Sequence, residues 1–86
     1  MSEEVMVGEI VKFFAKPSVA AIKVTDDAIK VGDELHYKGA TTDFTEVVES
    51  MEVENKQVAE APSGSLVGIK VGERVRPGDM VFKVSS

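Results

Sequence analysis

The feature that most constrains this chain is a repeated alternation of short, β-branched segments with glycine, proline and aspartate breaks. The segments VMVGEIVKFF, SVAAIKVT, DELHYK, SLVGIKV and DMVFKV are rich in Val, Ile and aromatic residues. Such segments favour strands, and a spacing of roughly ten residues is typical of small antiparallel barrels. We therefore predict an all-β fold, a small closed antiparallel β-barrel of about six or seven strands.

The stretch DFTEVVESMEVEN, residues 43–55, fits two secondary structures. Helical spacing fits four apolar residues at i, i+3, i+4 and i+7: Phe44, Val47, Val48 and Met51. Strand spacing instead places Val47, Met51 and Val53 on one side. We predict a strand, because three valines and the threonines before them are β-branched. If Val48 and Met51 both point inward, a bulge near Glu49 or Ser50 must absorb the change of parity.

Two other patterns predict how the strands lie. The first two segments flank Lys16-Pro17-Ser18 and are expected to pair as a hairpin. In DELHYK, apolar Leu35 and Tyr37 alternate with polar residues, as in a strand with one buried face and one face exposed to solvent.

Glycine and aspartate define the expected turns. The segments KVGDELHYK and RPGDMVFKV share a Gly-Asp pair, in which the glycine supplies a positive φ and the aspartate accepts backbone N–H bonds. We read these pairs as structural, not as metal ligands. The residues predicted to shape turns and tight backbone positions are Gly8, Gly32, Asp33, Gly64, Gly68, Pro77, Gly78 and Asp79.

Size and composition limit the classes of protein to consider. The 86 residues, 43% hydrophobic and 29% charged, have room for one domain, expected as a barrel over residues 5–84 with residues 1–4 disordered. The absence of cysteine excludes disulfides and thiolate metal sites. With no apolar segment near the roughly 20 residues of a membrane span and no signal-like start, we expect a soluble cytoplasmic protein without membrane contact.

Enzyme chemistry has little support. The single histidine, His36, lies on the polar side of its predicted strand, and nothing brings a serine beside it. The acids between Asp43 and Glu60 are read as a solvated strand edge. We therefore predict no catalytic residues, no metal and no cofactor.

The order of the motifs VGEI, KVGDELHYKG, VESMEV, AEAPSGSLVGIKV and VRPGDMVFKV resembles the β-barrel second domain of translational GTPases such as elongation factor Tu. KGATTDFTEVVESMEVENKQVAEA is similar to short stand-alone relatives called translation elongation factor-like proteins. The resemblance implies contact with tRNA, rRNA or the ribosome. Because the phosphate-binding Gly-Lys motif is missing, no nucleotide is expected.

The net charge of −5 opposes RNA binding, but the bases are unevenly distributed. The predicted RNA-binding residues are Lys12, Lys16, Lys23, Lys70, Arg74 and Arg76. The aromatic residues that could stack on bases or contact a partner are Phe13, Phe14 and Tyr37. Phe13 and Phe14 are adjacent, so on a strand they face opposite sides.

The alternative is a protein-interaction barrel that docks on a partner or self-associates. A related barrel resembles one appended to collagenase-like peptidases, which implies an accessory role beside such an enzyme. The acidic net charge favours this alternative over RNA.

Overall fold

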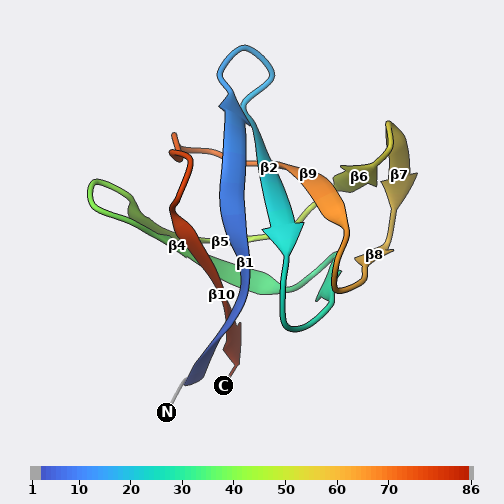
Figure 1. Cartoon of the computed structure of the whole chain (residues 1–86), viewed down its shortest axis with the longest axis horizontal. Coiled ribbons are helices and arrows are strands. Elements are labelled where there is room, and N and C mark those ends of the chain that lie inside the picture. The colour runs from blue at the N-terminus through green and yellow to red at the C-terminus, as the bar shows by residue number, and fades with distance from the viewer. Residues whose placement is uncertain (1–2, 86) are drawn as a thin grey trace.

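The chain folds into strands connected by turns. The computed structural model describes residues 3–85, and none of them lies in a helix, so the all-β prediction is confirmed. The strands are β1 (Glu3–Phe14), β2 (Val19–Val24), β3 (Ile29–Lys30), β4 (Glu34–Lys38), β5 (Asp43–Val47), β6 (Met51–Val53), β7 (Lys56–Val58), β8 (Glu60–Ala61), β9 (Leu66–Lys70) and β10 (Met80–Ser85) (Figure 1).

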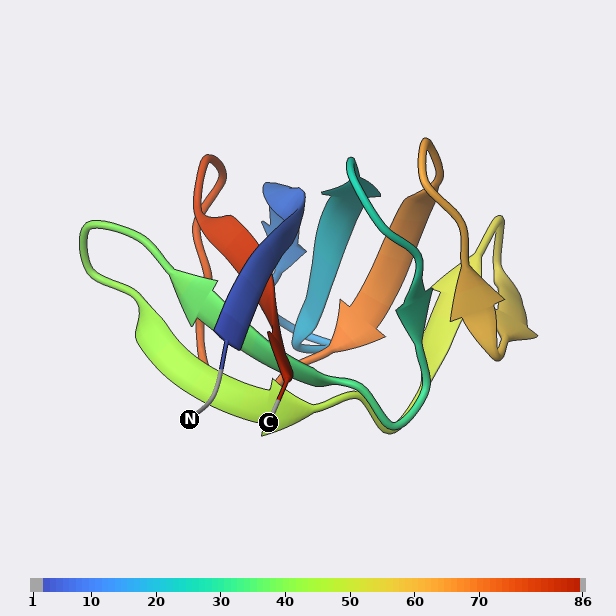
Figure 2. The ribbon, with the colours of Figure 1, turned by 90° about the horizontal axis from the view of Figure 1, so that it is seen from below.

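Eight of the strands form one antiparallel sheet in the order β5-β4-β10-β1-β2-β9-β6-β7, and β3 pairs with β8 in a separate two-stranded ladder. The large sheet is strongly curved, with β4 and β5 running beneath the other strands in Figure 2. Strands β5 and β7 each pair with one neighbour within the described residues, so the sheet stays open between them. The predicted closed barrel is therefore not confirmed.

Residues 43–55 form strands and not a helix, as predicted. The chain does not continue through a bulge, however. It leaves β5 at Val47 and re-enters the sheet at Met51, where β6 pairs with β9 instead of β4. Val48 lies in the break and is buried, and its amide donates to the Asp33 carbonyl at 2.8 Å. A change of pairing partner thus lets both Val48 and Met51 point inward.

The core lies on the concave side of the sheet. Its buried hydrophobic residues are Val7, Ile10, Ala20, Ile22, Val24, Ile29, Leu35, Tyr37, Val48, Met51, Ala61, Val67, Ile69, Val71, Val75 and Val81. The alternation in β4 follows the predicted pattern, with Leu35 and Tyr37 inside. In β2, Ala20, Ile22 and Val24 are buried. The predicted hairpin of β1 with β2 is present.

The N-terminal boundary differs from the prediction of a disordered segment over residues 1–4. Glu3 and Glu4 lie in β1 and pair with Ser85 and Val84 of β10. The Glu4 carboxylate also binds His36. Residues 1 and 2 lie outside the described part of the chain.

Both Gly-Asp turns have the same geometry. Gly32 and Gly78 have φ values of 97° and 93°, and the amides of Asp33 and Asp79 donate to the carbonyls of Lys30 and Arg76 at 3.0 Å. The aspartate carboxylates in turn accept from the amides of Lys30 and Arg76, at 2.8 and 2.9 Å. Pro77 is the second residue of its turn and Gly64 has a φ of 92° in a third turn, whereas Gly8 and Gly68 lie within strands.

Candidate interaction surface

The outer face of strands β1, β2, β9 and β6 carries a hollow. Because Ala20, Ile22 and Val24 point inward, Val19, Ala21 and Lys23 point outward. Cross-strand pairing places Ala21 beside Lys12 and Gly68, and Gly68 beside Glu52. It also places Val19 between Phe14 and Lys70.

A groove of about 630 Å³ lies over these positions. Its lining residues are Phe14, Pro17, Val19, Ala21, Ser50, Met51, Glu52, Glu54, Asn55, Leu66, Val67, Gly68 and Lys70. Phe14 and Leu66 are 43% and 54% exposed. One end of the groove is formed by the turn between β6 and β7, in which Glu54 and Asn55 both have positive φ, as a two-residue type I′ hairpin requires.

A bulge in β1 decides which phenylalanine reaches this groove. Ile10 is buried, and strict alternation would send Lys12 and Phe14 inward with it. The register with β2 shifts between Ile10 and Lys12, which reverses the parity beyond the shift. Phe13 therefore packs against the core and Phe14 faces outward.

Cations lie over both rings. Lys12 Nζ lies 5.0 Å from the centroid of the Phe14 ring, and Arg74 Cζ lies 6.0 Å from that of Phe13. Such contacts hold the ring and the base together by the attraction of a cation to the ring face. The third predicted aromatic contact, Tyr37, is 1% exposed and stacks on Phe44 with centroids 4.9 Å apart. Tyr37 is a core residue, so it is not available to a partner.

All six predicted RNA-binding bases are exposed, but acids are interspersed among them. Lys23 pairs across the strands with Glu9, and Glu52 borders the same face at Gly68. Lys12, Lys23 and Lys70 lie on the outer face of β1, β2 and β9, Lys16 lies in the β1–β2 turn, and Arg74 and Arg76 lie in the segment between β9 and β10. The outer face is thus mixed in charge.

His36 is held between two carboxylates. Its Nδ1 lies 2.8 Å from Glu4 Oε1 and its Nε2 lies 2.5 Å from Asp43 Oδ1. The hydrogen bonds to Asp43 and Glu4 raise the pKa of His36, and the same ring lowers the pKa of Asp43. Because carboxylates occupy both ring nitrogens, the histidine has no free nitrogen to take a proton from a nucleophile.

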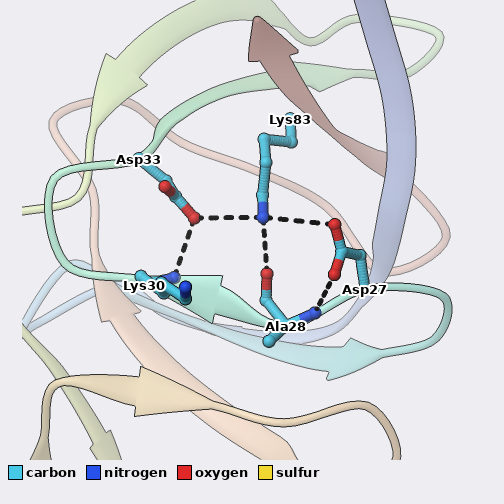
Figure 3. Close-up of polar contacts among 5 residues, drawn as sticks. All are labelled: Asp27, Ala28, Lys30, Asp33 and Lys83. Carbon is cyan, nitrogen blue, oxygen red and sulfur yellow. Dashed lines mark hydrogen bonds and ion pairs between the residues drawn. The ribbon is translucent and has the colours of Figure 1, made fainter.

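Lys83 of β10 ties the segment between β2 and β4 to the sheet (Figure 3). Its Nζ donates to the Ala28 carbonyl at 2.7 Å and lies 3.3 Å from Asp33 Oδ2 and 3.4 Å from Asp27 Oδ2. The Ala28 amide and Lys83 lower the pKa of Asp27. The contacts of Lys83 are all with other members of the cluster, so we interpret the cluster as structural.

Other kinds of site lack support among the residues that the structure describes. Between residues 3 and 85, no three His, Asp or Glu side chains gather as a group that could hold a metal ion. The same span contains no helix of the length and apolarity needed to cross a membrane.

Sequence comparison places the chain beside peptidases. No family model matches it. It is 40% identical over 80 residues to an uncharacterized protease of Methanocaldococcus jannaschii, covering 92% of this chain and 19% of that protein. It is 30% identical over 82 residues to a collagenase of Porphyromonas gingivalis, covering 94% of this chain and 20% of that protein. These relatives are peptidases, not translation factors. The chain spans about a fifth of their length.

Solved structures share the fold. The selenomethionine variant of the C-terminal domain of a putative U32 peptidase from Geobacillus thermoleovorans has a TM-score of 0.84 at 21% identity, covering 90% of this chain and 96% of that chain. GDP-bound aIF5B from Aeropyrum pernix has a TM-score of 0.63 at 14% identity, covering 95% of this chain and 14% of that chain. At such identities, both likenesses concern the fold alone.

The assignment to translation elongation factor-like proteins is therefore wrong. The curated relatives are a protease and collagenases, and the domain of a U32 peptidase superposes better than a translation factor does. The motifs that suggested elongation factors are Gly-Asp turns and short strands, which the fold itself requires. Contacts with tRNA, rRNA or the ribosome have no support in these relatives.

The groove contains residues that the sequence analysis missed: Val19, Ala21, Glu52, Glu54 and Leu66. One signal could have indicated them. From Val19 to Val24 both faces of the strand are apolar except at Lys23, which is unusual for a strand with one face in solvent. Outward-facing Val19 and Ala21 indicate an apolar patch on the outer face.

Proposed function

We propose that the chain is a non-catalytic interaction module that resembles the accessory domain of collagenase-like peptidases, and that it docks on a partner protein. The observation that carries this proposal is the coverage of the relatives. At least 92% of this chain matches them, yet the match occupies only 19–20% of each relative. The matched segment is thus one small part of a much larger peptidase.

Two further observations support a binding role over a catalytic one. The U32 peptidase domain with the same fold is described as a C-terminal domain, apart from the rest of its protein. In the present chain, both nitrogens of the one histidine bind carboxylates. The mostly apolar groove on the outer face offers a surface to a partner.

A binding experiment tests this function. The Methanocaldococcus jannaschii protease is produced without the segment that matches this chain, and the purified chain is titrated into it by calorimetry. We expect saturable binding to the shortened protease and weaker binding to the intact one, because the intact protein's own segment competes for the same position. Absence of binding to the shortened protease would contradict the proposal.

A further inference from the structure

The groove has an apolar floor where the exposed face of an antiparallel sheet is usually polar. Phe14, Val19, Ala21 and Leu66 line it, and the first and last of these are about half exposed. Its volume of about 630 Å³ lies within the roughly 300–1,000 Å³ of typical ligand sites. An apolar hollow of this size on a small chain indicates a surface that is covered in a complex.

Gly68 gives the groove its depth. It lies in the middle of β9, where its neighbours Val67 and Ile69 point into the core, so a side chain at position 68 would point into the groove. A Cβ there would meet Val19 Cγ1 at 3.3 Å. Glycine weakens a strand interior and often marks a close approach by another chain. The missing side chain leaves room for a side chain of a partner.

A cross-strand row that passes through the groove carries opposite charges at its two ends, with Glu52 in the groove lining and Lys12 just beyond it. The row runs from Lys12 through Ala21 and Gly68 to Glu52. It begins with a base, ends with an acid, and has small residues between them. Four neighbouring strands span about 14 Å, which matches about four residues of extended chain. The row therefore has the length and polarity to complement a short extended peptide.

We propose that this groove binds an extended segment of the partner protein, with a large apolar side chain over Gly68, an acidic residue beside Lys12 and a basic residue beside Glu52. The proposal rests on the protein-docking function above and specifies its surface and its ligand. The apolar side chain lies between Phe14 and Leu66, which flank the row on neighbouring positions. Glu54 at the β6–β7 turn adds a second acid at the basic residue's end.

A second copy of this chain fits the groove less well. Each copy carries a net charge of −5, so self-association brings like charges together. A partner segment with one acid and one base carries no such penalty.

The experiment uses blocked short peptides with a central Phe or Leu, one Glu and one Lys, in both charge orders. We expect one order to bind and to shift the amide NMR signals of Ala21, Gly68 and Glu52. Peptides with a central Ser are expected not to bind. Shifts confined to another face, or equal binding of the Ser peptides, would overturn the proposal.

Variants locate the site on the protein. Gly68→Leu fills the groove and Leu66→Ser removes an exposed apolar wall, and each is expected to raise the Kd at least about tenfold. Leu66→Ser keeps the test valid if Gly68→Leu does not fold. The matched control is Val47→Ser, which changes a 53% exposed valine on β5 outside the groove and should leave the Kd unchanged. The pair Lys12→Glu with Glu52→Lys should prefer the opposite charge order.

The same variants separate this inference from the proposed function. If the shortened protease binds the wild-type chain and all groove variants equally, the groove is not the binding site, and the docking function stands. If the peptides bind as expected but the shortened protease does not, the peptidase partner is refuted and the groove stands. Should Leu66→Ser instead convert a dimer of the chain to a monomer, the occupant is a second copy and the proposal is wrong.

Discussion

The imidazole of His36 and the carboxylate of Glu4 lie 2.8 Å apart, which joins β4 to β1 although β10 separates these strands in the sheet. Asp43 of β5 holds the other ring nitrogen, so one side chain links strands β1, β4 and β5. Both ring nitrogens can donate to these carboxylates only when the imidazole is protonated. The link is therefore sensitive to pH.

The first prediction concerns stability against pH. Asp43 and Glu4 raise the folded-state pKa of His36 above 6.5. The protonated His36 ring therefore contributes fully to the free energy of unfolding below the pKa that it has in the unfolded state. This contribution is lost as the pH rises through the pKa of the folded state. Because both carboxylates are well exposed, we expect at most about 1 kcal/mol. Urea unfolding between about pH 5 and 8 should show this loss in the wild type and not in His36→Gln.

A control for this prediction is Lys16→Gln, which changes an exposed charge in the β1–β2 turn. Its free energy of unfolding should follow the wild-type pH dependence. Identical pH slopes for the wild type and His36→Gln would show that the carboxylates do not stabilise the protonated ring.

The second prediction compares two glycines. A Cβ at Gly8 would lie 2.7 Å from Ile22 Cγ2 and 2.8 Å from the Lys23 carbonyl oxygen, inside the sheet. Gly8→Ala should therefore destabilise the fold by about 2–3 kcal/mol through overpacking. A Cβ at Gly64 would have no atom within 4 Å, so only the φ of 92° opposes a side chain there. Gly64→Ala should cost about 1 kcal/mol, and chemical denaturation distinguishes the two values.

If Gly64→Ala were as damaging as Gly8→Ala, the positive φ at Gly64 would cost as much as the crowding at Gly8. Equal, negligible effects would mean that β1 and β2 move apart locally at no cost.

Much of the fold followed from local pattern. Alternation in DELHYK identified the inward face of β4, and the Gly-Asp pairs identified two turns, because these features depend on neighbouring residues alone. The ladder of β3 with β8 was not predicted. Its strands have two residues each, too few for periodicity to appear.

The groove could be predicted only in part, because it depends on register. The exposure of Phe14 depends on the shift between Ile10 and Lys12, which is a property of the pairing with β2. The sequence indicates that one phenylalanine of the pair faces outward, but not which. Likewise, Gly68 and Glu52 become neighbours only when β6 pairs with β9.

The third prediction concerns Lys83, which acts across 55 residues of chain on the Ala28 carbonyl. Lys83→Met keeps the aliphatic stem but removes the donor, so the carbonyl of Ala28 and the carboxylate of Asp33 lose their common partner. We expect a loss of about 1 kcal/mol and faster amide exchange over residues 27–33. Lys56→Met, at an exposed position of β7, is the matched control. It should change neither the free energy of unfolding nor the amide exchange of residues 27–33. Unchanged amide exchange in Lys83→Met would show that Lys83 does not stabilise residues 27–33.

The fourth prediction uses the only tyrosine of the chain. Burial raises the pKa of Tyr37, with a smaller contribution from the charge of Glu46. The folded state therefore keeps the phenol protonated above its usual pKa of about 10, and ionisation favours unfolding. In an alkaline titration, tyrosinate absorbance should appear together with the loss of the folded far-ultraviolet dichroism. An absorbance that rises near pH 10 while the dichroism persists would mean that the hydroxyl reaches solvent in the folded state. Tyr37→Phe should remove the absorbance change and delay the alkaline unfolding, since the ionisable group that drives it is gone.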